Sequence, residues 1–189
     1  MKGYLNDEEA TRAVIRDGWF QTGDIGSFDS EGFLKITDRK KDIIVNSGGK
    51  NISPQNIENT VISDKFIAQI VVFGDKKPYL TALVVPSFEE LKHYAEYKKI
   101  PFGSQEELLK LPEIRSLIAR RISEHLRDFA HYEQIQYILL LPTEFSLEKG
   151  ELTPTLKVRR RVIMDRYRDL IEKLYLENPE RIAVPHDAS

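Results

Sequence analysis

The stretch that decides the fold covers residues 18–58 and reads GWFQTGDIGSFDSEGFLKITDRKKDIIVNSGGKNISPQNIE. Apolar runs flank the Asp-Ser-Glu-Gly segment at residues 29–32, and because these four residues favour turns, the pattern predicts a β-hairpin. A short strand is expected at residues 43–45. Ser53 and Pro54 then predict the start of a helix, because serine caps a free backbone N–H and proline loses no hydrogen bond in the first turn.

Beyond this stretch, strands and helices follow one another without strict alternation, which is typical of an α+β fold. The predicted elements are strands at 69–74, 79–86 and 135–141, helices that begin at Ser87, Ser104 and Pro112, and a last long helix over 162–174. The first two of these helices open with a Ser-x-x-Glu capping pattern. The tail from Asn178 onward is expected to be weakly structured.

The composition is that of a soluble globular protein. Of the 189 residues, 41% are hydrophobic and 31% are charged, which suffices for one domain plus a fragment. The formal net charge of −2 argues against a general nucleic-acid binder, and no apolar run approaches the roughly 20 residues of a membrane span. Cysteine is absent, which excludes disulfide bonds and thiolate nucleophiles and fits a reducing compartment.

Two polar residues near the first hairpin have the chemistry to bind a nucleotide. Asp24 follows Thr22-Gly23 at the end of an extended segment, where a carboxylate can accept hydrogen bonds from two ribose hydroxyls. Arg39 lies in the charged run 38–42, and its planar guanidinium can hold a phosphate or ribose oxygen. Taken alone, Asp24 is more simply a turn cap, and the charged run is a solvated surface or a hinge between two folded units.

Two adjacent glycines, Gly48 and Gly49, precede the helix predicted at Ser53. Such a pair allows positive φ and a close approach of the backbone to a ligand. The segment does not match a phosphate-binding P-loop, because Ile44 occupies the position of the first glycine and Asn51 replaces serine or threonine. A ligand-binding loop and a purely structural loop are both compatible with these residues.

The segment ELTPTLKVRR at residues 151–160 predicts an ordered loop that carries a lysine. Pro154 stiffens the loop and disfavours helix at Thr153. Lys157 would then project ahead of the last helix, where its ammonium can bridge a carboxylate and a phosphate. A lone lysine is more often a plain surface charge. Residues 159–161 are three arginines that either meet phosphates or, as the simpler interpretation, form a solvated first helical turn.

The order of these segments resembles that of the adenylate-forming enzymes, and within them the long-chain fatty acyl-CoA synthetases. The resemblance covers nearly the whole chain but only the C-terminal part of such an enzyme. It implies a small lid domain, with a mixed sheet and flanking helices, preceded by a hairpin remnant of the large N-terminal domain. The implied divisions are the end of the large domain at residues 1–37, a hinge at 38–41 and the small C-terminal domain at 42–189.

The resemblance also implies roles for individual residues. The matching aspartate and arginine of the family bind the nucleotide, the glycine loop lies along the pantetheine arm of CoA, and a lysine in the last loop is catalytic. Carried over by position, the implied set is Asp24 and Arg39 for the nucleotide, Lys41 for the hinge, Gly48, Gly49 and Lys50 for CoA, and Lys157 for catalysis.

The implied activity is ATP-dependent ligation of a long-chain fatty acid to CoA through an acyl-adenylate. ATP, CoA and fatty acid would be substrates, and Mg²⁺ is expected with its ligands in the large domain. The chain alone is therefore expected to be inactive without that domain, which would be its partner. Nucleic acid is not expected as a partner. The four histidines show no metal-ligand spacing, so no metal site is predicted in this chain.

Other functions are compatible with the same residues. The leading alternative is a stand-alone binding or interaction module that keeps the small-domain fold. Within the enzyme class, the alternatives are an aryl-CoA ligase and a peptide-synthetase adenylation domain. The expected location is cytoplasmic. Peripheral association at a membrane is compatible with this, because long-chain substrates dwell there, but the sequence does not decide it.

Overall fold

The computed structural model describes residues 1–177 and 179–186, apart from the side chains at 37 and 38. The chain divides into two compact units, Met1–Ile43 and Ile44–Ser189. The division follows closely after residues 38–41, which the sequence assigns to a hinge. Movement about those residues stays a prediction.

The first unit consists of a short helix and two small hairpins. Its elements are α1 (Glu8–Val14), β1 (Ile15–Arg16), β2 (Trp19–Phe20), β3 (Asp24–Phe28) and β4 (Leu34–Arg39). Strands β3 and β4 pair antiparallel, as the sequence predicts. The Asp29 carboxylate closes their turn by accepting the N–H groups of Glu31 and Phe33 over 3.0 and 2.9 Å. This side-chain-to-backbone bonding is the reason that aspartate favours turns.

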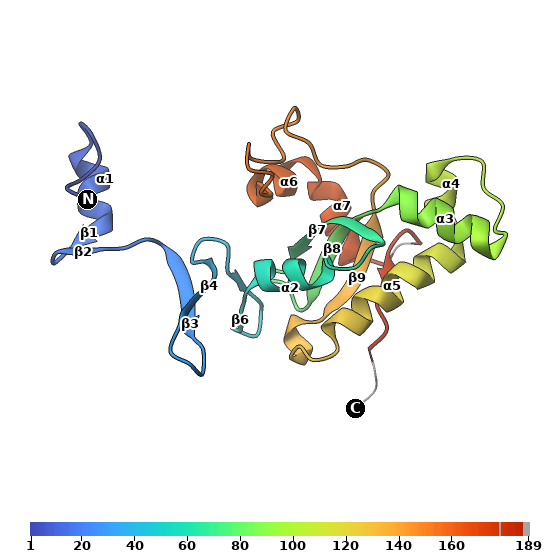
Figure 1. Ribbon diagram of the computed structural model, residues 1–189, viewed down its shortest axis with the longest axis horizontal. Coiled ribbons are helices and arrows are strands. Elements are labelled where there is room, and N and C mark those ends of the chain that lie inside the picture. The colour runs from blue at the N-terminus through green and yellow to red at the C-terminus, as the bar shows by residue number, and fades with distance from the viewer. Residues whose placement is uncertain (178, 187–189) are drawn as a thin grey trace. The chain divides into compact units, whose positions relative to one another are not determined.

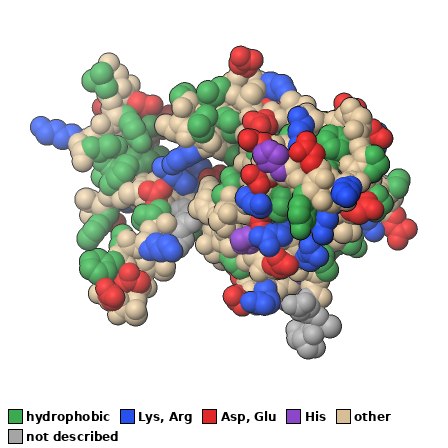
Figure 2. All heavy atoms as spheres, turned by 45° about the vertical axis from the view of Figure 1, so that its right-hand side comes forward, with side chains coloured by type: hydrophobic (Ala, Val, Ile, Leu, Met, Phe, Trp, Pro, Cys, Tyr) green, Lys and Arg blue, Asp and Glu red, His purple; other side chains and the backbone are tan. Residues whose placement is uncertain are grey.

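No described side chain of the first unit is buried. Several of its large apolar residues are instead exposed: Trp19, Phe28, Phe33, Leu34 and Ile36. Figure 2 shows hydrophobic side chains at the surface of one face of the molecule. An isolated two-stranded hairpin has marginal stability in water, because it offers no second layer against which to bury its apolar face. The described side chains of this unit therefore form no hydrophobic core of their own.

The second unit carries a four-stranded mixed sheet with helices on both faces (Figure 1). Its elements are β5 (Ile44–Val45), β6 (Asn51–Ile52), α2 (Pro54–Val61), β7 (Ile67–Phe73), β8 (Leu80–Pro86), α3 (Phe88–Lys98), α4 (Gln105–Lys110), α5 (Pro112–Leu126), a 3₁₀ turn (His131–Glu133), β9 (Ile135–Leu140), α6 (Arg160–Arg166), α7 (Arg168–Leu174) and β10 (Ile182–Ala183). The sheet order is β10-β9-β8-β7. The β8–β9 pair is parallel, while β7–β8 and β9–β10 are antiparallel.

Strand β8 shows why helices cover both faces of the sheet. All seven of its residues are buried. Ala82 and Val84 point to the core formed with α2, α3, α4 and α5, whereas Leu83 and Val85 point to the core formed with α6 and α7. Because successive side chains of a strand alternate between faces, a continuous apolar run requires cover on both sides. The α+β fold expected from the sequence is confirmed.

Local predictions have mixed outcomes. Ser53 caps α2 by accepting the N–H of Asn56, and Ser104 caps α4 by accepting that of Glu107, as predicted. Ser87 precedes α3 but makes no side-chain cap bond, so that prediction is wrong. None of the helices in the described part of the chain is long and apolar enough to cross a membrane.

Two predictions for the C-terminal region are also wrong. The last helix is not continuous, because it breaks at Tyr167 into α6 and α7. The tail is not uniformly weak, since Ile182 and Ala183 form β10 and pair with Ile138 and Tyr137. Ile182 and Val184 are both buried, so alternating apolar residues hold this segment on the sheet. The other predicted tail positions, 178 and 187–189, lie outside the described residues.

Candidate functional site

Lys157 lies in a tight hairpin whose base is an antiparallel bridge between Leu152 and Val158. Across the hairpin, the Thr153 N–H donates to the Lys157 carbonyl over 2.8 Å. The Lys157 N–H donates back to the Thr153 hydroxyl oxygen over 3.0 Å. Leu156 takes a left-handed conformation with φ of 59°, which lets the chain reverse in so few residues. The backbone at Lys157 is thus fixed by two hydrogen bonds.

The Lys157 side chain is exposed. Within residues 1–177 and 179–186, no ion pair or side-chain hydrogen bond engages its ammonium group. The ordered backbone fixes the position of the Lys157 Cα, and the flexible side chain extends a localised positive charge from it. This arrangement suits the binding of an anion.

The first strand of the Lys157 hairpin begins at a buried carboxylate that the sequence did not indicate as functional. The side chain of Glu151 is 0% exposed. One of its oxygens accepts bonds from Arg166 and Tyr167 over 2.9 and 3.2 Å, and the other accepts the Ser146 N–H over 3.0 Å. Burial raises the pKa of the Tyr167 hydroxyl above 10.0, and the negative charge of Glu151 raises it further. The tyrosine therefore stays protonated and donates to the carboxylate.

A second buried carboxylate, Glu58 on α2, holds the chain just after the hairpin. Its two oxygens pair with the Arg160 guanidinium over 2.8 and 2.9 Å. Glu58 also accepts the Val72 N–H over 2.7 Å, and Arg160 donates to the Val72 carbonyl over 2.5 Å. The solvated helical turn that the simpler interpretation expects is therefore wrong for Arg160, because its guanidinium is held in a mostly buried ion pair. A phosphate contact by these arginines stays a prediction. Arg159 and Arg161 are exposed.

The loop with Gly48, Gly49 and Lys50 connects β5 to β6. Asn46 shapes it, because the Asn46 side chain accepts the Lys50 N–H over 2.9 Å and the Asn46 carbonyl accepts the Gly49 N–H over 2.9 Å. Gly49 has φ of 73°, a conformation that favours glycine. The loop is also tied to the β7–β8 turn by the Ser47 N–H, which donates to the carbonyl of residue 77 over 3.0 Å.

Lys50 differs from Lys157 in that its ammonium has an aromatic neighbour. Its Nζ lies over the Tyr132 ring at 5.7 Å from the ring centroid. This distance is within the range of a cation–π interaction. The two predicted functional loops are connected through the fold, because α2 follows β6 directly and its Glu58 holds Arg160.

Asp24 and Arg39 belong to the first unit. They face each other at one end of the β3–β4 hairpin, where Asp24 Oδ1 and Arg39 Nε lie 2.8 Å apart. The Asp24 N–H donates to the Thr22 hydroxyl over 3.0 Å, so Thr22 caps this turn, whereas the Asp24 carboxylate, which the simpler interpretation made the cap, pairs with Arg39. Lys41 follows as an exposed residue. The structure thus brings the two residues assigned to the nucleotide together.

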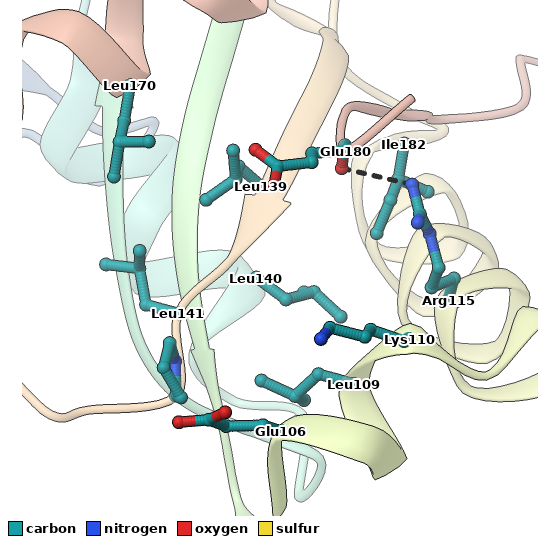
Figure 3. Close-up of a pocket in the computed structure, with 11 residues that line it drawn as sticks. Glu106, Leu109, Lys110, Arg115, Leu139, Leu140, Leu141, Leu170, Glu180 and Ile182 are labelled. Carbon is teal, nitrogen blue, oxygen red and sulfur yellow. Dashed lines mark hydrogen bonds between the residues drawn. The ribbon is translucent and has the colours of Figure 1, made fainter. Parts of the chain in front are cut away.

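A leucine-lined hollow of the second unit contains none of these residues. It encloses about 310 Å³ between the end of β9, helices α4 and α5, and the segment at residues 180–182 (Figure 3). Leucines line it. The Arg115 guanidinium beside it donates hydrogen bonds to the carbonyls of Pro179, Glu180 and Arg181. Across the described residues, no group of three or more His, Asp or Glu side chains could hold a metal ion.

The sequence pointed to Lys157 and the glycines but missed the residues that hold them: Asn46, Glu58 and Glu151. Asparagine before a Gly-Gly pair is a turn signal that could have identified Asn46. Glu151 directly precedes the Leu-Thr-Pro-Thr-Leu-Lys segment, yet nothing local distinguishes it from an exposed glutamate. Glu58 meets an arginine more than one hundred positions away, so no local pattern reveals it.

Comparison with known proteins places most of the chain in one family model. The model of the AMP-binding enzyme C-terminal domain matches residues 41–179. This match includes the glycine loop and the Lys157 hairpin, and it begins within the predicted hinge.

Among curated proteins, long-chain-fatty-acid–CoA ligase FadD15 of Mycobacterium tuberculosis is 38% identical over 92% of this chain and 29% of its own length. Long-chain-fatty-acid–CoA ligase 6 of the mouse is 39% identical over 93% of this chain and 26% of its own length. The chain thus spans less than a third of these relatives. A solved carboxylic acid reductase A-PCP didomain from Segniliparus rugosus, in complex with AMP, has a TM-score of 0.75 and 25% identity over 92% of this chain and 23% of that one.

Proposed function

Because this chain belongs to the family of AMP-binding enzyme C-terminal domains, we propose that it is the C-terminal part of an ATP-dependent long-chain fatty acid–CoA ligase. Two curated relatives that cover nearly all of the chain bear that activity in their names, which supports the substrate class. The observation that carries the proposal is the Lys157 hairpin: an ordered backbone presents an exposed ammonium group.

The proposed reaction has two steps. In the first, a carboxylate oxygen of the fatty acid attacks the α-phosphorus of ATP, the bond to the β-phosphate oxygen breaks, and pyrophosphate leaves. In the second, the CoA sulfur attacks the acyl carbonyl carbon of the adenylate, its proton is lost, and AMP leaves. The products are the acyl-CoA thioester, AMP and pyrophosphate.

We assign Lys157 to the first step. Both reactants are anions, so their approach brings negative charge together at the α-phosphate. A compact ammonium between the fatty acid carboxylate and the α-phosphate offsets this repulsion and stabilises the charge of the transition state. Because the Lys157 backbone is held by Thr153, the ammonium would act from a defined origin.

We assign the Gly48–Lys50 loop to the second step, in which it would lie along the pantetheine arm of CoA. The exposed glycines allow an extended ligand to approach the backbone closely. A turn of the second unit about residues 38–41, with Lys41 at the pivot, would exchange the two loops at one site. Closure steps of this kind can assemble one catalytic arrangement at a time.

Asp24 and Arg39 would hold the nucleotide through both steps. Their separation of 2.8 Å puts two acceptor oxygens and a guanidinium fork side by side, which suits a ribose with its neighbouring phosphate. Mg²⁺ would have to be bound by residues of the larger partner domain. The described residues hold no group of three or more His, Asp or Glu side chains that could bind a metal by themselves, and no step proposed for them involves the metal.

The test uses a chimera in which this chain replaces the matching part of the FadD15 ligase, because the chain alone is expected to be inactive. Two rates are measured separately: fatty-acid-dependent formation of the adenylate, and thioester formation from supplied acyl-adenylate and CoA. We expect Lys157→Ala to slow adenylation by about 100-fold or more and to leave thioester formation nearly unchanged. Lys92→Ala, which removes an exposed lysine on α3, is the matched control.

Equal loss of both rates in the Lys157→Ala chimera, or no loss of adenylation, would contradict the proposed role. The acyl substrate is tested in the same chimera with palmitate, benzoate and amino acids. Activity with benzoate or amino acids instead of palmitate would favour an aryl-CoA ligase or a peptide-synthetase adenylation domain. A chimera that folds but makes no adenylate from any of them would favour a non-catalytic module.

A further inference from the structure

We infer that Glu151 is a positioning residue that fixes the Lys157 hairpin against α6 and α7. This inference rests on the proposed role of Lys157 in adenylation. Glu151 would touch neither ATP nor fatty acid. Its buried carboxylate would hold the hairpin base in one orientation. The Lys157 ammonium group would then be pre-organised to contact the reacting anions.

The first step of the argument is the place of Glu151 in the hairpin. Glu151 directly precedes Leu152, which forms the basal bridge with Val158. The Glu151 carbonyl accepts the Arg159 N–H over 2.8 Å, so the residue joins both strands of the hairpin. Two rungs further, Thr153 and Lys157 are paired by hydrogen bonds. Any tilt of residue 151 is therefore transmitted to the backbone of Lys157.

The second step is the chemistry of the buried carboxylate. A carboxylate with no exposure to water needs hydrogen-bond donors to offset its desolvation. Glu151 has three, from Ser146, Arg166 and Tyr167, and they come from different directions. Arg166 and Tyr167 lie at the junction of α6 and α7, and Ser146 lies in the loop after β9. A group bound from several sides has one orientation that satisfies all its donors, which makes it an effective anchor.

The third step concerns packing beside the carboxylate. Leu152 is buried in the core that also contains Phe145 and Ile163. Tyr167 packs its ring edge-on against Phe145 at 5.9 Å between centroids while its hydroxyl reaches Glu151. The hairpin base is thus held by an apolar side chain and a charged one on adjacent residues. Catalytic groups held in this way by supporting residues lose less activity to misplacement.

The Glu58–Arg160 pair does not perform the same task. It holds the first residue of α6 on strand β7, beyond the second strand of the hairpin. Its contacts reach neither Thr153 nor Lys157. Glu151 is the buried carboxylate inside the hairpin, and its loss would free the hairpin while Arg160 keeps the start of α6 in place.

The chain offers a matched control in Asp64. Its side chain is also 0% exposed, and it also accepts three bonds, from the Phe66 N–H, Arg121 and His125. Asp64 lies between α2 and β7 and pairs with α5, which has no part in the hairpin. Asp64→Asn should therefore weaken the fold as a buried substitution does, without a specific effect on Lys157.

The test measures amide hydrogen exchange by NMR on the 189-residue chain. The N–H groups of Thr153 and Lys157 report on the hairpin, and those of Val71 and Leu83, paired in the sheet, report on the core. In Glu151→Gln an NH₂ group replaces one acceptor oxygen. We expect the hairpin amides to exchange at least about tenfold faster relative to the core amides, as the loss of one charged hydrogen bond implies. Asp64→Asn should not raise this ratio, because a loss of global stability speeds exchange of the core amides at least as much as that of the hairpin amides.

An unchanged ratio in Glu151→Gln would overturn the inference, because the carboxylate would then stabilise the fold without positioning the hairpin. Should Glu151→Gln fail to fold, Tyr167→Phe removes a single hydroxyl bond to the same carboxylate. It should raise the ratio in the same direction by a smaller factor, and no rise in Tyr167→Phe would overturn the inference equally.

A kinetic measurement in the FadD15 chimera separates this inference from the proposed function. We expect Glu151→Gln to lower the kcat of adenylation about tenfold or more, to change the KM for ATP little, and to leave thioester formation intact. If Lys157→Ala abolishes adenylation but Glu151→Gln does not lower it, the positioning role is wrong and the proposed function stands. If Lys157→Ala has no effect, the proposed function is wrong, whatever Glu151 does to the hairpin.

Discussion

Three carboxylates of the second unit, Glu58, Asp64 and Glu151, are buried, and each is matched with donors from other elements that the fold brings to it. An unmatched charge at these positions would be very costly, so the pairs constrain how the chain can fold. Sequence reasoning finds residues whose role is local, such as Ser53 at a helix cap or Lys157 in a proline-stiffened loop. It does not find these pairs, because burial and partner are decided by the assembled fold.

The Glu58–Arg160 pair gives a prediction about stability. Glu58→Gln leaves the Arg160 guanidinium largely buried and without its counter-charge. We expect a loss of about 3–5 kcal/mol in the free energy of unfolding, measured by urea denaturation. Glu172→Gln is the control, because Glu172 pairs with Lys77 at 2.8 Å but is 57% exposed. That change should cost less than about 1 kcal/mol.

The double variant Glu58→Met, Arg160→Met sharpens this prediction. It removes both charges at once and leaves neither buried alone. An apolar pair of similar volume can replace a buried ion pair, but here the Val72 N–H and carbonyl also lose their partners, so we expect the double variant to recover only part of the stability that Glu58→Gln loses. A Glu58→Gln variant as stable as the Glu172→Gln control would show that water reaches the pair and that the charge is not truly buried.

At the scale of elements, periodicity predicted the helices and strands whose sides face the core. The stripe on α5, with Ile114, Ile118 and Ile122 all fully buried, is of this kind. Periodicity failed where a tertiary contact decides the geometry. The break between α6 and α7 occurs at Tyr167, whose hydroxyl bonds Glu151, and β10 exists because β9 offers an edge. Neither cause is visible in the segment itself.

The link between α5 and the α2–β7 connection gives a prediction about pH. Burial alone would raise the pKa of Asp64, but hydrogen bonds from the Phe66 N–H, Arg121 and His125 outweigh it and hold the pKa below 3.8. A lowered pKa in the folded state stabilises the protein above the unfolded pKa. This contribution is present above about pH 4 and is lost as the pH falls through the folded value.

We therefore expect Asp64→Asn to lower the free energy of unfolding by about 1.5–3 kcal/mol at pH 7, with a smaller difference from the wild type as the pH falls below 4. Urea denaturation of both proteins at several pH values measures this difference, in which the titration of other carboxylates cancels. Asp165→Asn, at a side chain that is 59% exposed, should show a difference near zero throughout. A difference for Asp64→Asn that stays constant down to pH 2 would contradict the lowered pKa.

At the scale of the whole molecule, the two units differ in kind. Every buried hydrophobic residue of the described chain lies at or beyond Ile44, whereas the first unit exposes Trp19, Phe28 and Phe33. The resemblance implies a hinge at residues 38–41, and the charged run there is compatible with a hinge or with a solvated surface. The sequence could not predict that the described side chains of the first unit form no core, because its hairpin has the same apolar pattern as a buried one. Exposed apolar residues gathered on one segment are typical of a surface that binds another body.

This difference predicts that the second unit folds without the first. Deleting residues 1–43 removes no described buried side chain, so we expect the temperature of unfolding to change by less than about 3 °C. Calorimetry measures the transition, and limited proteolysis of the full chain should cut first within residues 1–43, where few contacts protect the backbone. The shortened chain should also be more soluble, because the exposed aromatic residues are gone. Loss of a cooperative transition on deletion would contradict this prediction. It would mean that the hairpins of the first unit contribute to the stability of the second unit.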